Sequence, residues 1–587
     1  MRTPLPLPMM NRLVSRVWGE AQAFLGRTRR FDWTDVWVGL GIVGLVFAAV
    51  RIAGEWTGPL RPAVHIDLSP WALPRYTLFS LSRGLIAYAI SLGFTLGYGY
   101  WAAHDRRAER LLIPLLDILQ SIPILGFMPG LVLALATVFP HTNVGLELAA
   151  VLMMFTGQVW NMTFSFYHSL RSIPSDLREV STVYRFSAWQ RLRQVELPAA
   201  TVGLVWNSMM SMAGGWFFLM INEAFVLGRH DFRLPGLGAY MSVAVAEGNA
   251  GAQLWAMVAM VLMIVALDQV LWRPLVVWSL RFRVEESAQA QEASSWMLDW
   301  LRRSRIVAAL RQRLTRTTRP EAAARGQGEP APVGEPSRWA GVLSVAAFLV
   351  LLVTLGYGML ELLRLLARVR AMQWGGIVTG ALMTLGRVAV STALGTLWAV
   401  PAGLAIGLSP RLSRALQPVV QVAASVPAPM LYPLVIAGLH RFGVPLGWGS
   451  ILLMLLGTQW YILFNVIAGA TAIPTDLREA ARSYRISGLD RLRRVYLPAV
   501  FPFLVTGWVT AAGGAWNASV VAEFVTFRGH VQSAWGVGSE ISRAAERADF
   551  PALAAGVFVL STVVVLLNRT VWRTCYRLAA ERFSLTR

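Results

Sequence analysis

Two residue types are missing or nearly missing from this 587-residue sequence, which has no lysine and one cysteine, Cys575. A single cysteine cannot form a disulfide within the chain or build a cysteine-based metal site. The phosphate-binding loop of nucleotide hydrolases needs a lysine that reaches the phosphates. We therefore expect any nucleotide-driven step to depend on a partner protein.

Charged residues are also scarce, at 14% of the sequence, whereas 55% of the residues are hydrophobic. A run of about 20 apolar residues can cross the hydrocarbon core of a bilayer as a helix. The pattern predicts an all-α polytopic membrane protein with about 12 transmembrane helices. The runs lie near 34–53, 76–101, 111–140, 145–168, 200–227 and 252–280, and near 339–361, 376–408, 415–440, 444–470, 498–525 and 549–572.

Two of these runs, 111–140 and 415–440, are predicted to be broken. Proline removes a backbone donor and clashes with the preceding turn of a helix. The prolines are Pro114, Pro123 and Pro129 in the first run, and Pro418, Pro427 and Pro433 in the second.

The formal net charge is +21, and all basic residues other than histidine are arginine. Such a charge on a soluble protein would suggest nucleic-acid binding. Here arginine is concentrated in short loops, with eight in 102–110 and 169–198 against four in 54–75 and 228–251. By the positive-inside rule, we expect both termini in the cytoplasm, contact with membrane lipid and no nucleic-acid partner. Arg364, Arg368 and Arg370, on the expected outer side, do not fit this rule.

The two sets of runs are copies of each other. Ile173-Pro-Ser-Asp-Leu-Arg-Glu179 recurs as Ile473-Pro-Thr-Asp-Leu-Arg-Glu479, and 16 of 27 positions are identical between 173–199 and 473–499. An even number of runs per copy leaves both copies in the same orientation. The sequence thus predicts two parallel six-helix domains, at 34–284 and 338–587.

The segments outside these domains are basic and amphipathic. Residues 1–33 and Trp296 to Arg316 place apolar side chains at helical spacing among arginines, so we expect both to lie on the cytoplasmic membrane surface. Thr317 to Ser337 is rich in proline, glycine, alanine and glutamate, which predicts a disordered tether. We therefore separate a cytoplasmic arm, 1–33, and a cytoplasmic linker, 285–337.

The duplicated segment is polar and helix-forming, although it lies between apolar runs. In the second copy a helix is expected to begin near Pro474, with Thr475 as its cap and Asp476 and Glu479 placing negative charge in its first turn. Each copy should therefore present a short rigid helix that a partner can move as a body.

A second short helix is expected to follow in each copy. The spacing of a capping box, in which a serine caps the helix and the third residue after it bonds back, occurs in both copies. The pairs are Ser187 with Gln190 and Ser487 with Asp490. Each copy is thus predicted to form a helix–turn–helix on the cytoplasmic face.

Glu479-Ala480-Ala481, followed by Val495-x-Leu497-Pro498, resembles the EAA loop of type I ABC importer permeases. The first copy has the looser Glu179-Val180-Ser181 and Val195-x-Leu197-Pro198. In that family the loop contains the coupling helix, which docks in a groove on the ATP-binding subunit. The resemblance covers both copies, and it implies a permease subunit that is not itself an enzyme.

The resemblance also implies partners and a location. Two copies of a cytoplasmic ABC ATPase subunit would bind ATP and Mg, a periplasmic substrate-binding protein would deliver the cargo, and this chain would need no cofactor. The location is the bacterial inner membrane, crossed many times. The residues implied to couple the chain to the ATPase are Asp176, Leu177, Arg178, Glu179, Tyr184 and Arg185, with Asp476, Leu477, Arg478, Glu479, Ala480, Ala481, Tyr484 and Arg485.

Arg185 and Arg485 depart from the family pattern, which has glycine six residues after the glutamate. Glycine at that place would ease a left-handed turn. Arginine in both copies suggests either a longer first helix or an ion pair with the ATPase.

Polar residues within apolar runs are candidates for the substrate pathway, because they are costly to place in lipid. Asn222 with Glu223, and Asn517 with Glu523, lie toward the outer ends of matching runs. The pattern Gly513-Gly-x-Trp, ending in Ala-Glu523, is similar to the nitrate/taurine/sulfonate/bicarbonate subgroup of these permeases. That similarity implies a small anion as cargo.

Arg83 and Arg387, at matching positions, are further pathway candidates because a cation would attract an anion. The alternative is a structural ion pair, or an arginine that reaches the outer interface. Four polar residues are expected to bond neighbouring helices instead, namely Gln158, Asn161, Asn207 and Gln459. The seven histidines are scattered without ligand spacing, so no metal site is expected.

Other functional classes remain open at this point. A fused permease of a ferric-ion ABC importer is also duplicated, and composition does not separate an anion from a metal cargo. An ion-coupled secondary transporter can also have twelve spans in two parallel halves. A membrane-embedded enzyme would need a nucleophile–base pair or a metal cluster, and the sequence shows neither. The repeated loop favours the ABC importer.

Overall fold

The computed structural model describes residues 33–59, 64–121, 124–227, 230–282, 295–304, 338–527 and 530–583. The chain divides into two compact units, Met1–Ala53 with Gln289–Pro332, and Gly54–Ala288 with Val333–Arg587. The predicted arm lies outside the described residues except for position 33, and the tether Thr317 to Ser337 lies wholly outside them. The described residues of the first unit form two helices, α2 (Trp33–Thr57) and α13 (Trp296–Arg303). Helix α2 belongs to this unit as far as Ala53.

The second unit contains both copies, and the first copy is built mainly of long helices. These are α3 (Leu73–His104), α4 (Arg106–Ser121), α5 (Ile124–Val138), α6 (Val144–Arg171), α9 (Leu197–Asn222) and α11 (Ala250–Leu267). The shorter elements are η1 (Pro70–Ala72), α7 (Ser175–Val183), α8 (Ala188–Arg191), η2 (Leu192–Glu196), β1 (Ala224–Leu227), β2 (His230–Arg233), α10 (Leu237–Ala246), η3 (Asp268–Trp272), α12 (Arg273–Ser279) and η4 (Leu280–Phe282).

The second copy repeats this order of elements. Its long helices are α15 (Arg338–Leu366), α16 (Ala371–Leu408), α17 (Pro410–Ser425), α18 (Ala428–Arg441), α19 (Leu446–Thr471), α22 (Leu497–Ala522) and α24 (Phe550–Leu567). The shorter elements are α20 (Thr475–Ser483), α21 (Gly488–Arg491), η6 (Leu492–Tyr496), β3 (Phe524–Phe527), β4 (His530–Ser533), α23 (Val537–Glu546), η7 (Asn568–Trp572) and α25 (Arg573–Arg582).

A helix or a helix pair occupies each of the predicted apolar runs. Within the described residues, seven helical segments are long and apolar enough to cross a membrane, or up to nine if each bent pair counts as one span. The bent pairs are the two proline-rich runs. Helices α4 and α5 meet at 96° and helices α17 and α18 at 83°. Pro427 stands just before α18, whereas Pro123 lies outside the described residues.

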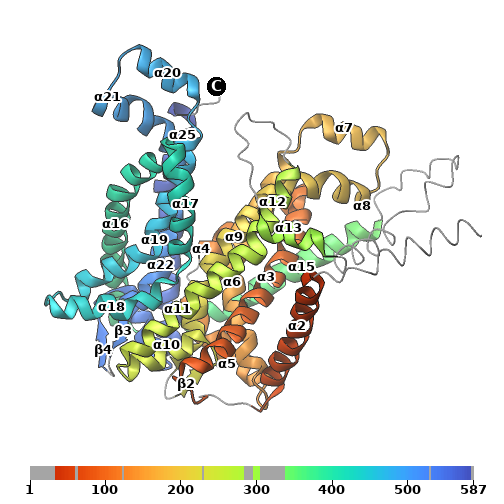
Figure 1. The fold of residues 1–587 in the computed structure, drawn as a ribbon. Helices are drawn as coiled ribbons and strands as arrows, with labels where there is room; N and C mark the ends of the chain where they lie inside the picture. Colours follow the sequence, from red (N-terminus) through yellow and green to blue (C-terminus); the bar gives the residue numbers. More distant parts are fainter. Residues whose placement is uncertain are drawn as a thin grey trace, which may run out of the picture. The chain divides into compact units, whose positions relative to one another are not determined.

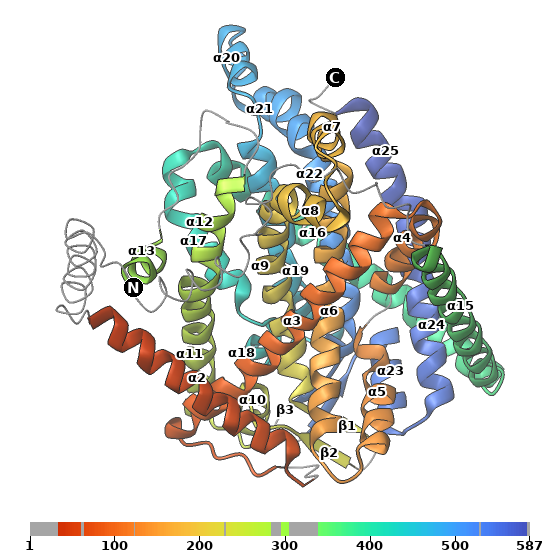
Figure 2. The same ribbon diagram turned by 90° about the vertical axis from the view of Figure 1, so that its right-hand side faces the viewer.

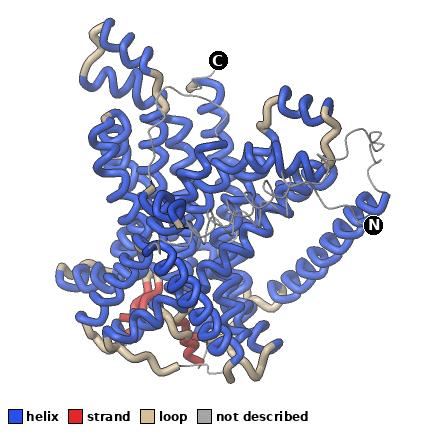
Figure 3. Tube along the Cα trace, turned by 45° about the vertical axis from the view of Figure 1, so that its right-hand side comes forward, coloured by secondary structure: helices blue, strands red, loops and turns tan. Residues whose placement is uncertain are grey.

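Two predicted spans end earlier than the apolar runs suggest. The runs 200–227 and 498–525 leave the helix at Asn222 and Ala522, and each continues into a two-stranded antiparallel hairpin. The registers pair Leu227 with His230 and Phe527 with His530. A short apolar run does not by itself distinguish helix from strand, which is why the sequence missed these hairpins. Figure 3 shows the two strand pairs near one end of the helices.

The helices of the second unit pack in matching groups, α3 with α6 and α9, and α16 with α19 and α22. Helix α15 packs along α24, as Figure 2 also shows. In Figure 1, α7 and α8 lie at the same end of this unit as α20 and α21, and the β-hairpins lie at the opposite end. The duplicated motif is therefore on one face in both copies, as the parallel duplication predicts.

The largest apolar core is shared by the two copies. It includes Leu125 and Trp216 from the first copy and Met430 and Trp516 from the second. Within a bilayer, van der Waals packing between these side chains stabilises the contact, because lipid tails are as apolar as the side chains themselves. The two copies thus form one packed bundle.

Candidate functional site

Each duplicated motif forms a helix–turn–helix, here called a repeat hairpin, at Ser175–Glu196 and at Thr475–Tyr496. In the first, the amide of Arg185 donates to Thr182 (3.0 Å) and that of Phe186 to Ser181 (2.9 Å). This pair of bonds closes a helix end of the Schellman type, which requires a left-handed residue. Arg185 supplies it, with φ of 50°.

The second repeat hairpin closes in the same way. Arg485 has φ of 53°, and the amides of Arg485 and Ile486 donate to Arg482 and Ala481, both at 2.9 Å. The first helix is therefore not lengthened, which was one of the two expectations for arginine at this place. A non-glycine residue in this region costs about 1–3 kcal/mol and persists only where its surroundings enforce it.

The starts of the short helices differ from the expectation in two places. Thr475 is the first residue of α20 and Pro474 stands at the cap position, so the predicted threonine cap is not formed. Ser187 and Gln190 form the predicted reciprocal cap of α8. Ser487 makes no such bond, and the side chain of Asp490 lies 3.6 Å from that of Arg494.

The residues implied to meet an ATPase lie mostly on the outside of the repeat hairpins. Tyr184 and Tyr484 are 72% and 81% exposed. Asp176, Glu179 and Arg185 are also exposed, as are Asp476, Glu479, Ala480 and Arg485. Leu177 and Leu477 are half-buried.

Two of the implied residues serve the hairpins themselves. Ala481 is buried, as is Ser181 at the matching position. Arg178 donates to the carbonyls of Leu170 and Arg171, both at 3.0 Å, and so fastens the first hairpin to the end of α6. Arg478 is half-buried, and its Nε has no hydrogen-bond partner among the described residues.

At the opposite end of the bundle, Arg83 is fully buried between two carboxylates. Its Nη2 lies 2.6 Å from Glu147, and its Nη1 lies 2.7 Å from Glu223. Glu223 also accepts from Ser80 and from the amide of Gly238, both at 2.7 Å. We call this group the first glutamate cluster. It ties α3, α6, α9 and α10 together.

The second glutamate cluster is simpler. Arg387 Nη1 lies 2.7 Å from Glu523, which also accepts from Thr384 (2.9 Å) and the amide of Gly538 (3.0 Å). Arg387 Nε donates to the carbonyl of Gly447, which stands where the first copy has Glu147. These bonds support the structural ion-pair alternative for both arginines.

Two glycines make the clusters possible. A Cβ at Gly236 would collide with the carboxyl group of Glu223, and one at Gly536 would collide with that of Glu523. The repeated Gly-x-Gly pattern thus leaves space for a buried carboxylate beside the backbone.

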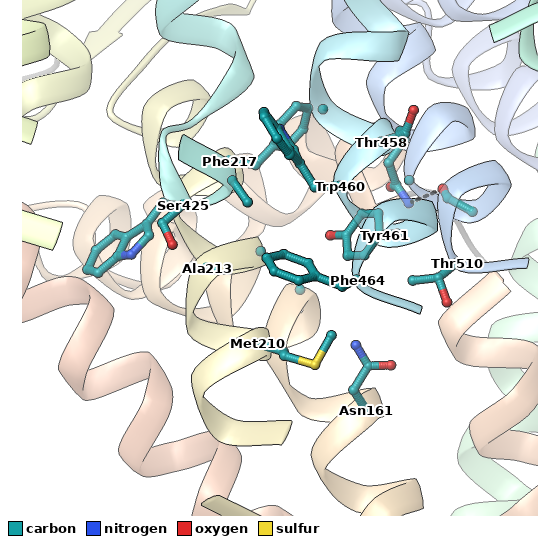
Figure 4. A pocket seen from close by; sticks show the side chains of 18 of the residues that line it. Asn161, Met210, Ala213, Phe217, Ser425, Thr458, Trp460, Tyr461, Phe464 and Thr510 are labelled. Carbon is teal, nitrogen blue, oxygen red and sulfur yellow. Dashed lines mark hydrogen bonds between the residues drawn. The ribbon is translucent and has the colours of Figure 1, made fainter. Parts of the chain in front are cut away.

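A cavity of about 620 Å³ lies between the two copies. Helices α4, α6 and α9 with η3 line it from the first copy, and α17, α19 and α22 with η7 from the second. In Figure 4, Met210 and Phe217 of the first copy lie around the same space as Tyr461 and Phe464 of the second. Its size is that of a pocket for an organic small molecule.

Of the six predicted pathway residues, Asn517 is the one found among the described residues of the cavity wall. Its side-chain oxygen accepts from the amide of Ile124 in the other copy (2.8 Å). Arg83, Arg387, Glu223 and Glu523 belong to the glutamate clusters instead. Asn222 is buried, and its side chain has no hydrogen-bond partner within the described ranges.

The expectation that buried amide side chains bond neighbouring helices is met at one position and not at another. Asn207 donates to Ser165 (2.9 Å), which joins α9 to α6. Asn161 instead is exposed on the wall of the cavity. The sequence analysis also did not single out Glu147 or Asp268. For Asp268 a signal was available, because the 300-residue offset matches it with an uncharged residue, Asn568.

Comparison with known proteins identifies both copies. The family described as "Binding-protein-dependent transport system inner membrane component" matches residues 89–271 and again 395–572. These two matches include the cavity-lining helices and the repeat hairpins of each copy.

Several relatives are transport proteins. A nitrate import permease protein of Leptolyngbya laminosa is 34% identical over 143 residues, 24% of this chain and 50% of that protein. A bicarbonate transport system permease protein of Synechocystis is 28% identical over 197 residues, 33% of this chain and 67% of that protein. A taurine transport system permease protein of Escherichia coli is 27% identical over 185 residues, 32% of this chain and 64% of that protein. The chain thus spans half to two thirds of the length of these relatives.

Proposed function

Because the chain belongs to the family of binding-protein-dependent transport system inner membrane components, we propose that its two copies together form the transmembrane pathway of an ATP-driven importer. The pathway passes through the cavity between the copies. The repeat hairpins receive the movement of ATP-binding subunits.

The observation that carries this proposal is the continuity from each repeat hairpin to the cavity wall. In the first copy, η2 runs directly into α9, whose residues Trp206 to Phe218 include much of the wall. In the second, η6 runs directly into α22, which contributes Val509 to Ala518. A displaced hairpin therefore carries its wall helix with it, because short rigid helices move as bodies.

The proposed motor is a pair of cytoplasmic ABC ATPase subunits, which bind ATP and Mg. The lack of lysine, and hence of a phosphate-binding loop, supports a separate ATPase. The exposed Tyr184 and Tyr484, with the exposed carboxylates of Glu179 and Glu479, supply a matching contact surface on each hairpin. A periplasmic substrate-binding protein is proposed to deliver the cargo on the other side of the bacterial inner membrane, with both termini in the cytoplasm.

The proposed cargo is a small anion or a solute with an anionic group, of the nitrate, sulfonate/taurine or bicarbonate type. The names of the relatives support this class over a ferric ion. The repeat hairpins support an ATP-driven importer over an ion-coupled secondary transporter.

The test is the double variant Glu179→Arg with Glu479→Arg in liposomes that contain the chain and its ATPase subunits. Reversal of one exposed charge on each hairpin should abolish cargo-stimulated ATP hydrolysis and transport while the complex remains folded. Glu361→Arg, at a half-exposed position of α15 outside the hairpins, is the control and should keep both activities. Full stimulated hydrolysis and transport in the double variant would refute the coupling role.

A further inference from the structure

The wall of the cavity carries charge of only one sign among the described residues. Asp268 is a carboxylate, and no arginine or histidine is among the described lining residues. A compact anion in this space would therefore meet repulsion without a compensating cation. Charge interactions are stronger in a site partly shielded from water than in bulk water, so this sign matters for the cargo.

Asp268 stands at a distinctive place in the fold. It begins the π-helical turn η3, directly after α11, and π-helical turns are frequent at functional sites. One carboxylate oxygen accepts from Gln269 at 3.1 Å. Arg273 is exposed, donates to Gln269 (3.3 Å) and attracts Asp268 electrostatically, but no direct ion pair of Asp268 is formed within the described part of the chain. The carboxylate thus keeps capacity for a cationic partner.

The matching turn of the other copy lacks this charge. Residue 568, at an offset of 300, is asparagine, and it lines the same cavity from η7. Trp272 and Trp572 line the cavity at matching positions. The turns also differ next to the carboxylate, because Arg569 and Thr570 stand where the first copy has Gln269 and Val270. Arg569 is not among the described residues of the cavity wall.

Aromatic side chains cover much of the wall. Seven of the chain's 24 tryptophans line the cavity. The face of an indole ring is negative and attracts a cation, by about 0.5–2 kcal/mol depending on solvent exposure. The same rings bury the apolar body of an organic solute. A nitrate or bicarbonate ion has no such body.

Neutral donors are present for a polar or anionic end. Asn161 is exposed on the cavity wall, and its side chain makes no hydrogen bond with another described residue. Tyr461 lines the same space and offers a hydroxyl group (Figure 4). Convergent polar groups in a mainly aromatic pocket are what fixes the orientation of a small organic ligand.

We infer that the cargo is a zwitterionic organic solute whose ammonium group pairs with Asp268 and whose apolar or aromatic body lies among the tryptophans. Its acidic group faces the neutral donors on the wall. This inference rests on the proposed function, since it takes the cavity as the pathway. It assigns Asp268 as the residue that selects for the ammonium group, and it narrows the proposed cargo class from compact inorganic anions to organic solutes.

The experiment measures binding to the purified full chain in lipid nanodiscs by calorimetry, with three probes. 4-(Aminomethyl)benzoate carries an ammonium and a carboxylate on an aromatic ring, 4-methylbenzoate lacks the ammonium group, and nitrate lacks the organic body. The aminomethyl compound should bind at least about tenfold more tightly than the other two, as expected for a shielded charge pair. Equal or tighter binding of 4-methylbenzoate or nitrate would overturn the inference.

The variant Asp268→Asn reproduces the side chain that the fold already holds at position 568, so it is expected to fold. It should abolish the preference for the aminomethyl compound. The exchange variant, Asp268→Asn with Asn568→Asp and Arg569→Gln, should restore the preference, because both positions line one cavity and the new carboxylate then has the neutral neighbour of the original. Glu361→Gln, on α15, is the control and should leave the preference unchanged. A preference that survives Asp268→Asn would overturn the assignment.

This test is separate from that of the proposed function. Binding to the isolated chain needs no ATPase, so a failure of coupling leaves the affinity comparison intact. Conversely, stimulated ATP hydrolysis without any preference for the ammonium group would refute the inference and retain the importer.

Discussion

Glu147 and Gly447 occupy matching positions at an offset of 300, and each accepts a hydrogen bond from the arginine of its own copy's glutamate cluster. The first does so through a side-chain carboxylate and the second through a backbone carbonyl. The hydrogen-bond acceptor at this place in the fold is thus a charged group in one copy and a neutral backbone dipole in the other. The arginine side chains are 1% and 14% exposed, respectively.

This difference predicts unequal effects of removing the arginines. Arg83→Met leaves two buried carboxylates without their cation, which should lower the free energy of unfolding by about 3–5 kcal/mol. Arg387→Met leaves one carboxylate, which keeps its bonds from Thr384 and Gly538, and should cost less. Thermal unfolding of the purified variants in detergent measures both. A larger loss for Arg387→Met would contradict the cluster description.

The left-handed turns of the repeat hairpins predict a gain from glycine. Arg185→Gly and Arg485→Gly remove a conformational cost of about 1–2 kcal/mol each. The amides of Phe186 and Ile486, which donate across the turn, should then exchange their hydrogens more slowly. Hydrogen-exchange mass spectrometry of the assembled complex measures this.

The control for that prediction is valine at the same two positions, since a β-branched residue strongly disfavours the left-handed region. Exchange should become faster, and stimulated ATP hydrolysis should fall. If the glycine variants gain protection yet lose stimulated hydrolysis, the arginines contact the ATPase directly.

The unequal caps of the second short helices give another comparison. Ser187 accepts from the amide of Gln190 at 3.2 Å, so Ser187→Ala should destabilise its hairpin by about 1 kcal/mol. Ser487 makes no cap bond, so Ser487→Ala should change little. Local hydrogen exchange over 187–196 and 487–496 reports both, and equal effects would argue against the observed difference.

The close approach of backbone and carboxylate predicts intolerance at Gly236. Gly236→Ala places a methyl group against the Glu223 carboxyl and should sharply reduce the yield of folded protein. Gly130→Ala is the matched control, because a Cβ there meets nothing within 4 Å and alanine favours a helix by about 1 kcal/mol. Size-exclusion profiles of the two variants distinguish them. A well-folded Gly236→Ala protein would show that the carboxylate can move aside.

The sequence predicted those features that repeat or follow a period. The apolar runs located the long helices, the prolines located the two bent pairs, and the offset of 300 located both repeat hairpins. Each of these features is visible in the order of residues along the chain, without knowledge of which distant residues come into contact.

Features that depend on distant contacts were not predictable in the same way. Glu147 is 64 positions from Arg83, and nothing local to α6 indicates the pairing. Asp268 follows an apolar helix, and the π-helical turn changes the residues-per-turn period that a face assignment assumes. The β-hairpins were missed because their first strands continue apolar runs.

The two walls of the cavity come from different parts of one chain, so each wall has its own sequence. In an assembly of two identical chains, every mutation would appear on both sides of the central space at once. Here each side can change without the other, and the pairs Phe217 with Asn517 and Asp268 with Asn568 are places where the two copies differ. Duplication within one chain thus permits an asymmetric cavity.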